Sequence, residues 1–330
     1  MPSIGSKRIV KKSLLLVLFF SLIFVSLRLQ FALLQKIPVQ DANQTFIVER
    51  GDSLYGILSN LEEKYNLSST WWIRFKYMFK ESPVIKAGRY NIFPNTTVSE
   101  LIERFEDGDV QLFKIAIIEG TVAKNNLVNL ENIIEDQNLN FEVPQSVRDI
   151  FAKEALIMPD TYFFSDAQDL KKVLNNSKLF LDEYLNNAWK EKPKNNPLQS
   201  PYEALVLASI IEREAVLPSE QEKIASVFLS RLNIDMKLQA DPTSSYGFYG
   251  DYGKKIGRAV LDDKNPYNTY QNKGLPPGPI CYPSKGAIDA AIKSSPGEFY
   301  YFVAKGDGSH IFSKTYEEHN KAVKKYIYSK

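Results

Sequence analysis

The sequence has one cysteine and two histidines among its 330 residues. The single Cys281 excludes an internal disulfide framework, and a lone cysteine without clustered histidines argues against a structural zinc site. A glycine-rich phosphate-binding loop is also missing, so we expect neither a metal nor a nucleotide cofactor. With so few thiol and imidazole groups, carboxyl groups are the main candidates for acid–base chemistry.

Acidic residues are absent from the first 34 positions, which carry Lys7, Arg8, Lys11, Lys12 and Arg28. Because the whole chain has a net charge of only +2, the remainder is mildly acidic. A mildly acidic globular part lacks the basic surface that nucleic-acid binding requires, and we expect no nucleic-acid partner.

Long hydrophobic runs are missing too, with one exception at residues 13–34, directly after the basic tail. As a helix this run extends roughly 33 Å, enough to cross a bilayer, and Arg28 is close enough to its far end to snorkel. Residues 29–34 lack the small residues of a signal-peptide cleavage site, which favours an uncleaved anchor over a signal peptide. The basic flank predicts a single-pass protein of the inner (plasma) membrane with its N-terminus in the cytoplasm.

The length and the hydrophobic content of 44% predict two domains plus the anchor. The predicted fold class is α+β throughout. We expect a cytoplasmic tail at 1–12, the transmembrane helix at 13–34, a short polar tether at 35–44, a small α+β module at 45–110 and a larger mixed α+β domain at 111–330.

Capping signals outline the larger domain. A long amphipathic helix is predicted between Gln168 and Trp189. Ser200–Glu203 supplies an N-cap, a proline at the first helical position and a glutamate three residues after the cap. Ser219–Glu222 repeats the capping box ahead of a helix that runs to Leu232. Residues 299–312 predict a hairpin around a glycine-rich turn, followed by a terminal helix.

Two glutamates, Glu212 and Glu214, lie at the end of the apolar helix that begins at Pro201. A carboxyl group among apolar neighbours, at the negative end of a helix, tends to keep its proton. A protonated carboxyl can donate to the leaving oxygen when a glycosidic bond breaks. Both glutamates fall at the borders of the apolar stripe, so periodicity alone does not choose between them, and both are also typical of solvated residues at a helix end.

Several spaced blocks then occur in one order along the chain. They are Lys86–Tyr90, Met158–Tyr162, Ala208–Glu214, Ser226–Leu232, Leu238–Thr243, Tyr267–Tyr270, Gly274–Ile280, Ser309–Phe312 and Glu318–Asn320. With these blocks the sequence resembles the YceG-like endolytic murein transglycosylases from the anchor to the C-terminus. The blocks after residue 238 are rich in turns and in amide, hydroxyl and aromatic groups, the mixture that sugar-binding clefts use.

The resemblance implies a lytic transglycosylase, a carbon–oxygen lyase that cuts MurNAc-β-1,4-GlcNAc bonds inside nascent peptidoglycan strands. The family's catalytic acid–base falls on Glu214; the threonine that often follows is Ala215 here, which removes a possible local hydrogen bond. The sugar's own C6 hydroxyl attacks and closes a 1,6-anhydro ring, so one glutamate can serve as acid and then as base. Asp241, Glu220 and Asp160 remain open as a second carboxylate. The expected substrate-binding residues are Gln239, Asp241, Thr243, Tyr246, Asn268, Thr269, Tyr270, His310 and Asn320.

The smaller module begins with Phe46–Leu54, which looks like the opening of a LysM-type module, and the family carries a LysM-like region there. This module is expected either to contact glycan strands or to act as a structural spacer. The resemblance also implies peptidoglycan synthases and division or elongation proteins as possible partners at the same membrane.

Two other functions are compatible with parts of the sequence. Gly51–Leu54 spells the nucleophile block of GDSL-type esterases, and Ser53 with Asp307 and His310 would form a triad that acts on cell-wall esters. The alternating strand–helix units of that fold are missing, however. The second alternative is a non-catalytic membrane-anchored scaffold that binds wall polymer or division proteins, and it predicts that changing Glu214 leaves function intact.

Overall fold

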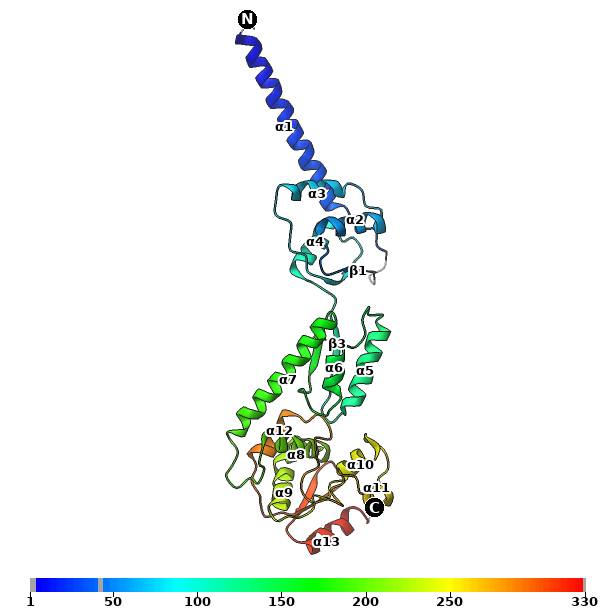
Figure 1. Cartoon of the computed structure of the whole chain (residues 1–330), viewed down its shortest axis with the longest axis vertical. Helices are drawn as coiled ribbons and strands as arrows, with labels where there is room; N and C mark the ends of the chain where they lie inside the picture. The colour runs from blue at the N-terminus through cyan, green and yellow to red at the C-terminus, as the bar shows by residue number, and fades with distance from the viewer. Residues whose placement is uncertain (1–3, 41–43, 329–330) are drawn as a thin grey trace. The chain divides into compact units, whose positions relative to one another are not determined.

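The computed structural model describes residues 4–40 and 44–328 of the chain. The chain divides after Phe113 into two compact units, residues 1–113 and 114–330, and Figure 1 traces the elements of both. In the described part of the chain, strands occur as three two-stranded pairs among many helices. The prediction of a mixed α and β structure is therefore confirmed.

The first unit starts with helix α1 (Ile4–Leu34). Its segment Lys11–Leu34 has a mean hydropathy of 2.3 over 24 residues, and it alone among the described residues is long and apolar enough to cross a membrane. Side chains from Leu14 to Leu27 are largely exposed in the isolated chain. Such a helix is compatible with a membrane anchor or a signal sequence.

A small α/β module completes the first unit. Its elements are β1 (Gln44–Val48), α2 (Leu54–Tyr65), α3 (Thr70–Met78), β2 (Gly88–Ile92) and α4 (Val98–Asp107). The strands β1 and β2 pair antiparallel, with Phe46 opposite Tyr90. The ring of Phe105 packs edge-on against Tyr90 at a centroid distance of 4.7 Å. The chain therefore follows the order strand, helix, helix, strand around one aromatic-centred core.

The predicted polar tether does not form in the described residues 35–40. The side chains of Ile37 and Val39 are buried in the core of the module. The backbone N–H of Ile37 donates to the carbonyl oxygen of Thr96 at 2.9 Å. The prediction was wrong because it weighed the polar residues of the segment and overlooked that the two apolar ones alternate with them, as in a half-buried strand. Helix α1 is thus joined directly to the module.

The second unit contains the remaining elements. Helices and two strands come first along the chain, helices alone follow, and a hairpin and one more helix come last. They are β3 (Phe113–Ala116), α5 (Ala123–Asp136), α6 (Gln145–Phe151), β4 (Thr161–Phe164), α7 (Ala167–Trp189), α8 (Pro201–Glu214), η1 (Pro218–Glu220), α9 (Gln221–Asn233), α10 (Asp241–Tyr249), α11 (Arg258–Asp262), α12 (Lys285–Lys293), β5 (Tyr301–Ala304), β6 (His310–Ser313) and α13 (Tyr316–Tyr326). The strands β3 and β4 pair. The predicted hairpin is confirmed as antiparallel β5–β6.

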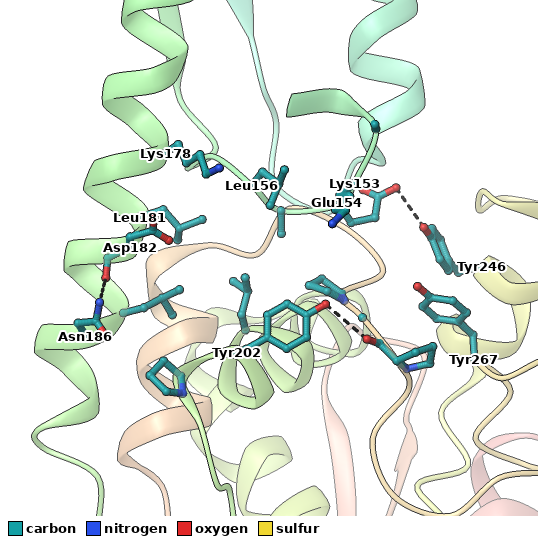
Figure 2. Close-up of a pocket in the computed structure, with 18 residues that line it drawn as sticks. Lys153, Glu154, Leu156, Lys178, Leu181, Asp182, Asn186, Tyr202, Tyr246 and Tyr267 are labelled. Atoms are coloured by element: carbon teal, nitrogen blue, oxygen red, sulfur yellow. Dashed lines mark hydrogen bonds between the residues drawn. The ribbon is translucent and has the colours of Figure 1, made fainter. Parts of the chain in front are cut away.

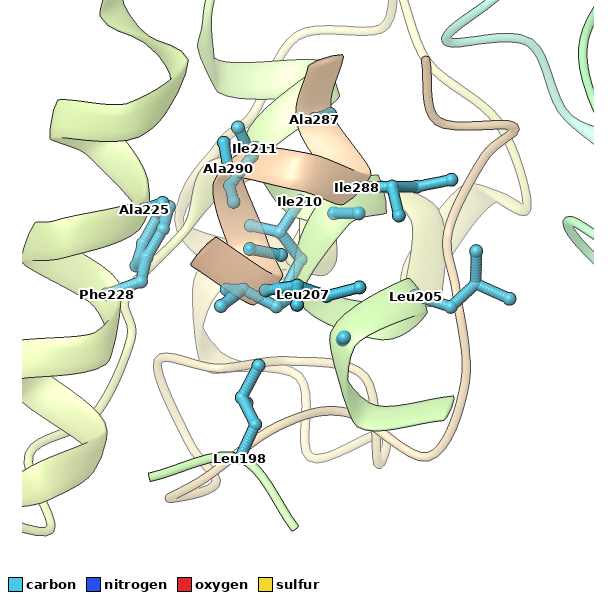
Figure 3. Packing of buried hydrophobic residues seen from close by; sticks show 14 of the residues in the cluster. Leu198, Leu205, Leu207, Ile210, Ile211, Ala225, Phe228, Ala287, Ile288 and Ala290 are labelled. Atoms are coloured by element: carbon cyan, nitrogen blue, oxygen red, sulfur yellow. The ribbon is translucent and has the colours of Figure 1, made fainter. Parts of the chain in front are cut away.

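Helix α8 lies at the centre of the second unit. Every residue from Ala204 to Ile211 is buried, because the helix contacts α7, α9, α10 and α12. Figure 3 shows Leu207 and Ile210 of α8 packed among side chains of α9 and α12. A helix that is apolar all round requires such enclosure. The backbone at the end of α8 is therefore held firmly by the core.

The capping signals had different outcomes. Ser200 caps α8 as predicted: its hydroxyl accepts a hydrogen bond from the Glu203 N–H at 3.2 Å, with Pro201 at the first helical position. The capping box predicted at Ser219 does not form. The short 3₁₀ turn η1 replaces it, and the N-cap residue of α9 is Glu220, which makes no side-chain cap hydrogen bond.

Candidate active site

A cavity of about 390 Å³ opens in the second unit at the C-terminal end of α8. Helices α9 and α13, the hairpin β5–β6 and the segment before α10 supply its other walls. Its lining includes the predicted site residues Glu214, Gln239, Asp241, Tyr270 and His310. The remaining lining residues are Arg231, Tyr301, Phe302, Val303, Ala304, Tyr316 and His319. Segments up to about a hundred residues apart in the sequence thus meet around one polar and aromatic cavity.

The structure separates the two candidate glutamates. The carboxylate of Glu212 accepts hydrogen bonds from the Ser284 N–H at 3.0 Å and from its hydroxyl at 2.6 Å. Because Ser284 is the N-cap of α12, its contact with Glu212 stabilises the start of that helix. Glu214 instead lines the cavity. Among the described residues its carboxyl group has no hydrogen-bond partner, so it can bond a ligand without breaking an existing contact.

The surroundings of Glu214 favour its protonated form. Burial and the nearby carboxylate of Asp241 raise the pKa of Glu214 to about 8, against the opposing effect of the Arg231 and Arg213 cations. Burial disfavours a charged carboxylate because it loses the hydration of bulk water. The side chain is half-buried, since one side faces the cavity. A carboxyl group that keeps its proton at neutral pH can act as a general acid.

Asp241 is the second carboxylate of the cavity. It lies at the first position of α10, and its Oδ1 accepts a hydrogen bond from the Tyr270 hydroxyl at 2.7 Å. Burial and this contact raise the pKa of the Tyr270 hydroxyl. Just ahead, Gln239 adopts a positive φ of 47°, a conformation that costs free energy for a residue other than glycine. Such strain is common at functional sites. The conformation of Gln239 sets the direction of the backbone in this part of the cavity wall.

Arg231 lines the cavity and was not among the predicted site residues. Its guanidinium donates from Nε to the carbonyl of Tyr300 at 2.7 Å and from Nη1 to the carbonyl of Leu238 at 2.5 Å. Burial lowers its pKa, yet an arginine remains charged at neutral pH. This cation links the hairpin to the segment before α10. The signal in the sequence was the one arginine of the block Ser226–Leu232, which lies in α9.

His310 enters the cavity from β6 and is held by Glu220. The Glu220 carboxylate lies 2.7 Å from the ring Nδ1 and accepts from the His310 backbone N–H at 3.1 Å. The two side chains are 7% and 16% exposed. Burial would raise the pKa of Glu220, but the hydrogen bonds from His310 outweigh it and lower that pKa. Since Nδ1 is occupied, Nε2 is the ring nitrogen that remains for a ligand.

On α13 the cavity is lined by His319, whereas the prediction had selected Asn320. Neighbouring residues on a helix point about 100° apart, and the sequence motif does not reveal which of the two faces inward. The His319 ring stacks on Tyr301 at a centroid distance of 5.3 Å. Its Nδ1 is buried and has no hydrogen-bond partner within the described residues. Burial and the Arg231 cation lower the pKa of His319, so the ring is neutral.

Three predicted substrate-binding residues lie beneath the cavity and do not line it. Thr243, Asn268 and Thr269 are almost completely buried. The hydroxyls of Thr243 and Thr269 bond each other at 2.8 Å. The Asn268 amide donates to three carbonyls within residues 260–263 and accepts from the Tyr270 N–H at 3.0 Å. These side chains therefore hold the loop that presents Tyr270.

Tyr246 lines a different cavity of the same unit, of about 700 Å³. Figure 2 shows its hydroxyl directed at Glu154, to which it donates at 3.2 Å. The Glu154 carboxylate also accepts from the Ala123 N–H at 2.7 Å. Burial, as the largest cause, raises the pKa of Glu154 to about 7. Glu154 was not predicted, because nothing in its local sequence distinguishes it from a solvated loop residue.

The esterase alternative finds no support in the contacts of its three residues. The Asp307 carboxylate accepts from the N–H and the hydroxyl of Ser309 instead of orienting His310. The ring of His310 is bonded to Glu220. The Ser53 hydroxyl accepts from the Gly56 N–H as the N-cap of α2. Each residue of the supposed triad thus has a structural partner outside the triad.

The second unit is a mixed α/β structure in which a carboxyl group of raised pKa, a buried arginine and a histidine bonded to a carboxylate lie around one polar and aromatic cavity. The chain belongs to the YceG-like family, whose model matches residues 46–325. This match spans both the small module and the unit that contains the cavity.

Three relatives can be compared over most of the chain. It is 30% identical to an endolytic murein transglycosylase of Bacillus subtilis over 324 residues, which cover 89% of this chain and 88% of the relative. It is 26% identical to an endolytic murein transglycosylase of Streptococcus pneumoniae, with 91% of this chain covered but only 62% of that longer relative. A crystal structure of a YceG-like protein from Listeria monocytogenes matches with a TM-score of 0.52 and 27% identity, covering 84% of this chain and 98% of that chain.

Proposed function

We propose that the protein is a membrane-anchored lytic transglycosylase that cuts β-1,4 glycosidic bonds inside peptidoglycan strands. The observation that carries this proposal is Glu214: a carboxyl group with a pKa raised to about 8, free of hydrogen bonds to the described residues and facing the cavity. The names of the relatives from Bacillus subtilis and Streptococcus pneumoniae support the same activity.

The proposed reaction uses Glu214 twice. Its carboxyl proton passes to the glycosidic oxygen as the bond between that oxygen and the anomeric carbon C1 breaks. The C6 hydroxyl oxygen of the same muramic sugar bonds to C1, and its proton passes to the Glu214 carboxylate. The products are a 1,6-anhydro end and a free 4-hydroxyl end, and the glutamate regains its starting state. Because the nucleophile belongs to the substrate, orientation replaces the activation of a water molecule.

The other cavity residues are proposed to hold the sugars and the transition state. Asp241, which accepts a hydrogen bond from Tyr270, is proposed to stabilise with its negative charge the cationic anomeric centre that glycosidic cleavage creates. The Nε2 atom of His310 and the side chain of Gln239 offer hydrogen bonds to hydroxyl groups. The rings of Tyr301 and Tyr316 supply flat apolar surface for a sugar face.

The anchor is proposed to be α1, with the basic N-terminus in the cytoplasm and the small module and the second unit on the opposite side of the inner (plasma) membrane. That side holds peptidoglycan, and synthases and division or elongation proteins of the same membrane are the proposed protein partners. The module at 45–110 is proposed to be LysM-like. Its support is the strand–helix–helix–strand order with β1 paired to β2.

Product analysis tests the proposal. The full-length protein in detergent is incubated with uncrosslinked peptidoglycan strands, and the fragments are identified by mass spectrometry. We expect fragments with 1,6-anhydro ends. Fragments with reducing ends would contradict the lytic mechanism and indicate hydrolysis, with Asp241 as the first residue to examine for activation of water. The absence of any cleavage would favour the non-catalytic scaffold.

The pH dependence of cleavage follows from the raised pKa of Glu214. We expect kcat/KM to fall about tenfold per pH unit above about pH 8, because the general acid loses its proton there. In Asp241→Asn the negative charge that raises this pKa is removed. The alkaline limit, which is the pH above which kcat/KM falls, therefore moves to a lower value. A pH–rate profile of both proteins measures the shift. An alkaline limit unchanged in Asp241→Asn would contradict this assignment.

Replacing Glu220 tests the positioning of His310. In Glu220→Gln the histidine keeps a neutral hydrogen-bond partner but loses the carboxylate. We expect kcat/KM to fall about tenfold, because the loss of one charged hydrogen bond costs roughly 1.5 kcal/mol. Glu222→Gln changes an exposed glutamate of α9 and serves as the matched control. Equal activity of the two variants would show that the Glu220 contact is purely structural.

A further inference from the structure

Helix α3 carries an aromatic stripe on its outer face. Trp71 and Phe75 of α3 and the C-cap residue Phe79 are spaced four residues apart, which aligns Trp71 and Phe75 on one side of the helix. The rings of Trp71 and Phe75 stack at 5.4 Å, and those of Phe75 and Phe79 meet edge-on at 5.2 Å. Trp71 is 57% and Phe79 is 79% exposed. In contrast, Ile73 on the inner face is fully buried in the core of the module.

The stripe is next to the apolar helix α1. The ring of Trp72 meets Phe24 of α1 edge-on at a centroid distance of 6.0 Å, and α3 crosses α1 close to the C-terminal end of α1 (Figure 1). Further along α1, Ala32 is buried in the core of the module. The last two turns of α1 therefore belong to the module, and α3 contacts the part of α1 that precedes them.

In the proposed membrane span of α1, Arg28 is the charged residue nearest to the outer boundary of the hydrocarbon. A charged side chain is costly inside a membrane and is favoured at its boundary. The guanidinium lies over the Phe24 ring at 5.7 Å. Phe24 is one helical turn, about 6 Å, closer to the membrane centre than Arg28. A tryptophan in contact with Phe24 is therefore at the depth where tryptophan side chains collect in membrane proteins.

We propose that α3 lies in the membrane interface with its stripe of Trp71, Phe75 and Phe79 among the lipids, so that the module is seated on the bilayer. The occupant of the stripe is the bilayer itself, because the stripe continues the exposed apolar surface of α1. The charges of α3 are compatible with this orientation: Arg74 pairs with Glu62 of α2 at 2.8 Å, and α3 has no acidic residue. In this arrangement α3 adds apolar surface beside the outer end of the proposed membrane segment.

Lipid quenching of tryptophan fluorescence tests the inference, which rests on the proposed membrane span of α1 and not on catalysis. The chain has three tryptophans, Trp71, Trp72 and Trp189. Full-length Trp72→Phe/Trp189→Phe retains only Trp71, and Trp71→Phe/Trp72→Phe retains only Trp189. Both variants are reconstituted in phosphatidylcholine–phosphatidylglycerol vesicles, with and without bromine on the acyl chains.

We expect blue-shifted Trp71 emission that brominated lipid quenches several-fold more strongly than Trp189 emission. Equal quenching of Trp71 and Trp189, or no quenching of Trp71, would overturn the inference. A third variant that retains only Trp72 separates the stripe from the contact with α1. Quenching of Trp72 without quenching of Trp71 would mean that the stripe faces water or a protein, and it would also overturn the inference. Cleavage of peptidoglycan is not measured, so failure here is distinct from failure of the proposed activity.

Discussion

Glu214→Gln is expected to reduce peptidoglycan cleavage about 100- to 10,000-fold, the usual contribution of a general acid–base. Glutamine has nearly the same shape but no proton to donate to the glycosidic oxygen. The fold is expected to survive, because the carboxyl group has no hydrogen-bond partner among the described residues. Since the variant also removes a half-buried ionisable group, its unfolding midpoint at pH 8 is expected to equal or exceed that of the wild type. Cleavage rates and thermal unfolding measure both effects.

Glu212→Gln is the matched control, two residues earlier on the same helix. Its carboxylate caps α12 through Ser284, and the loss of such a contact costs about 1 kcal/mol of stability. We expect this variant to be slightly less stable than the wild type and to retain cleavage. If Glu212→Gln lost as much activity as Glu214→Gln, the assignment of the acid to Glu214 would be wrong.

Asn268→Ala is expected to be the most damaging change outside the hydrophobic core. The buried amide donates hydrogen bonds to the carbonyls of Val260, Leu261 and Asp263. Its carbonyl oxygen accepts from the Ser244 hydroxyl at 2.8 Å. Each such bond contributes roughly 1 kcal/mol, and in the variant its partners stay buried without a hydrogen bond. We therefore expect the free energy of unfolding to fall by about 3 kcal/mol. Calorimetric unfolding of the full-length protein measures it.

Asn272→Ala provides the comparison for this stability prediction. The Asn272 amide also donates to backbone carbonyls, those of Asn265 and Asn268, but the residue is exposed. Water replaces these bonds in the variant, and a loss below about 1 kcal/mol is expected. A loss as large as that of Asn268→Ala would show that burial does not set the cost in this loop.

Local signals in the sequence correctly predicted helix starts and turns that are determined by a few neighbouring residues. The N-cap and proline at Ser200 and Pro201 start α8, and the glycine-rich turn joins β5 to β6. The failed capping box at Ser219 shows the limit of this reasoning. Its spacing was correct, but Glu220 of the same segment bonds His310, which is 90 residues away.

The choice between site residues depended on contacts across the fold. Glu212 and Glu214 are equivalent by helical periodicity, and only Ser284, 72 residues away, separates their environments. Asn268 and Tyr270 are three-dimensional neighbours with different tasks, because one is beneath the cavity wall and the other is part of it. Residue types led to the prediction of a sugar-binding region, but they did not reveal which of its side chains are buried and hold the loop.

The raised pKa values of Glu214 and Glu154 also mean that the protein takes up protons when it folds. An unfolded glutamate titrates near pH 4.5, whereas these two titrate at about 8 and about 7 in the folded chain. Between these limits the native state holds more protons than the unfolded state, so the free energy of unfolding decreases as the pH rises. Their full stabilising contribution exists only below about pH 4.5 and is lost as the pH passes 7 and then 8. The same surroundings that ready Glu214 to donate its proton thus leave the native state less stable in alkaline surroundings than in acidic ones, as far as these two groups are concerned.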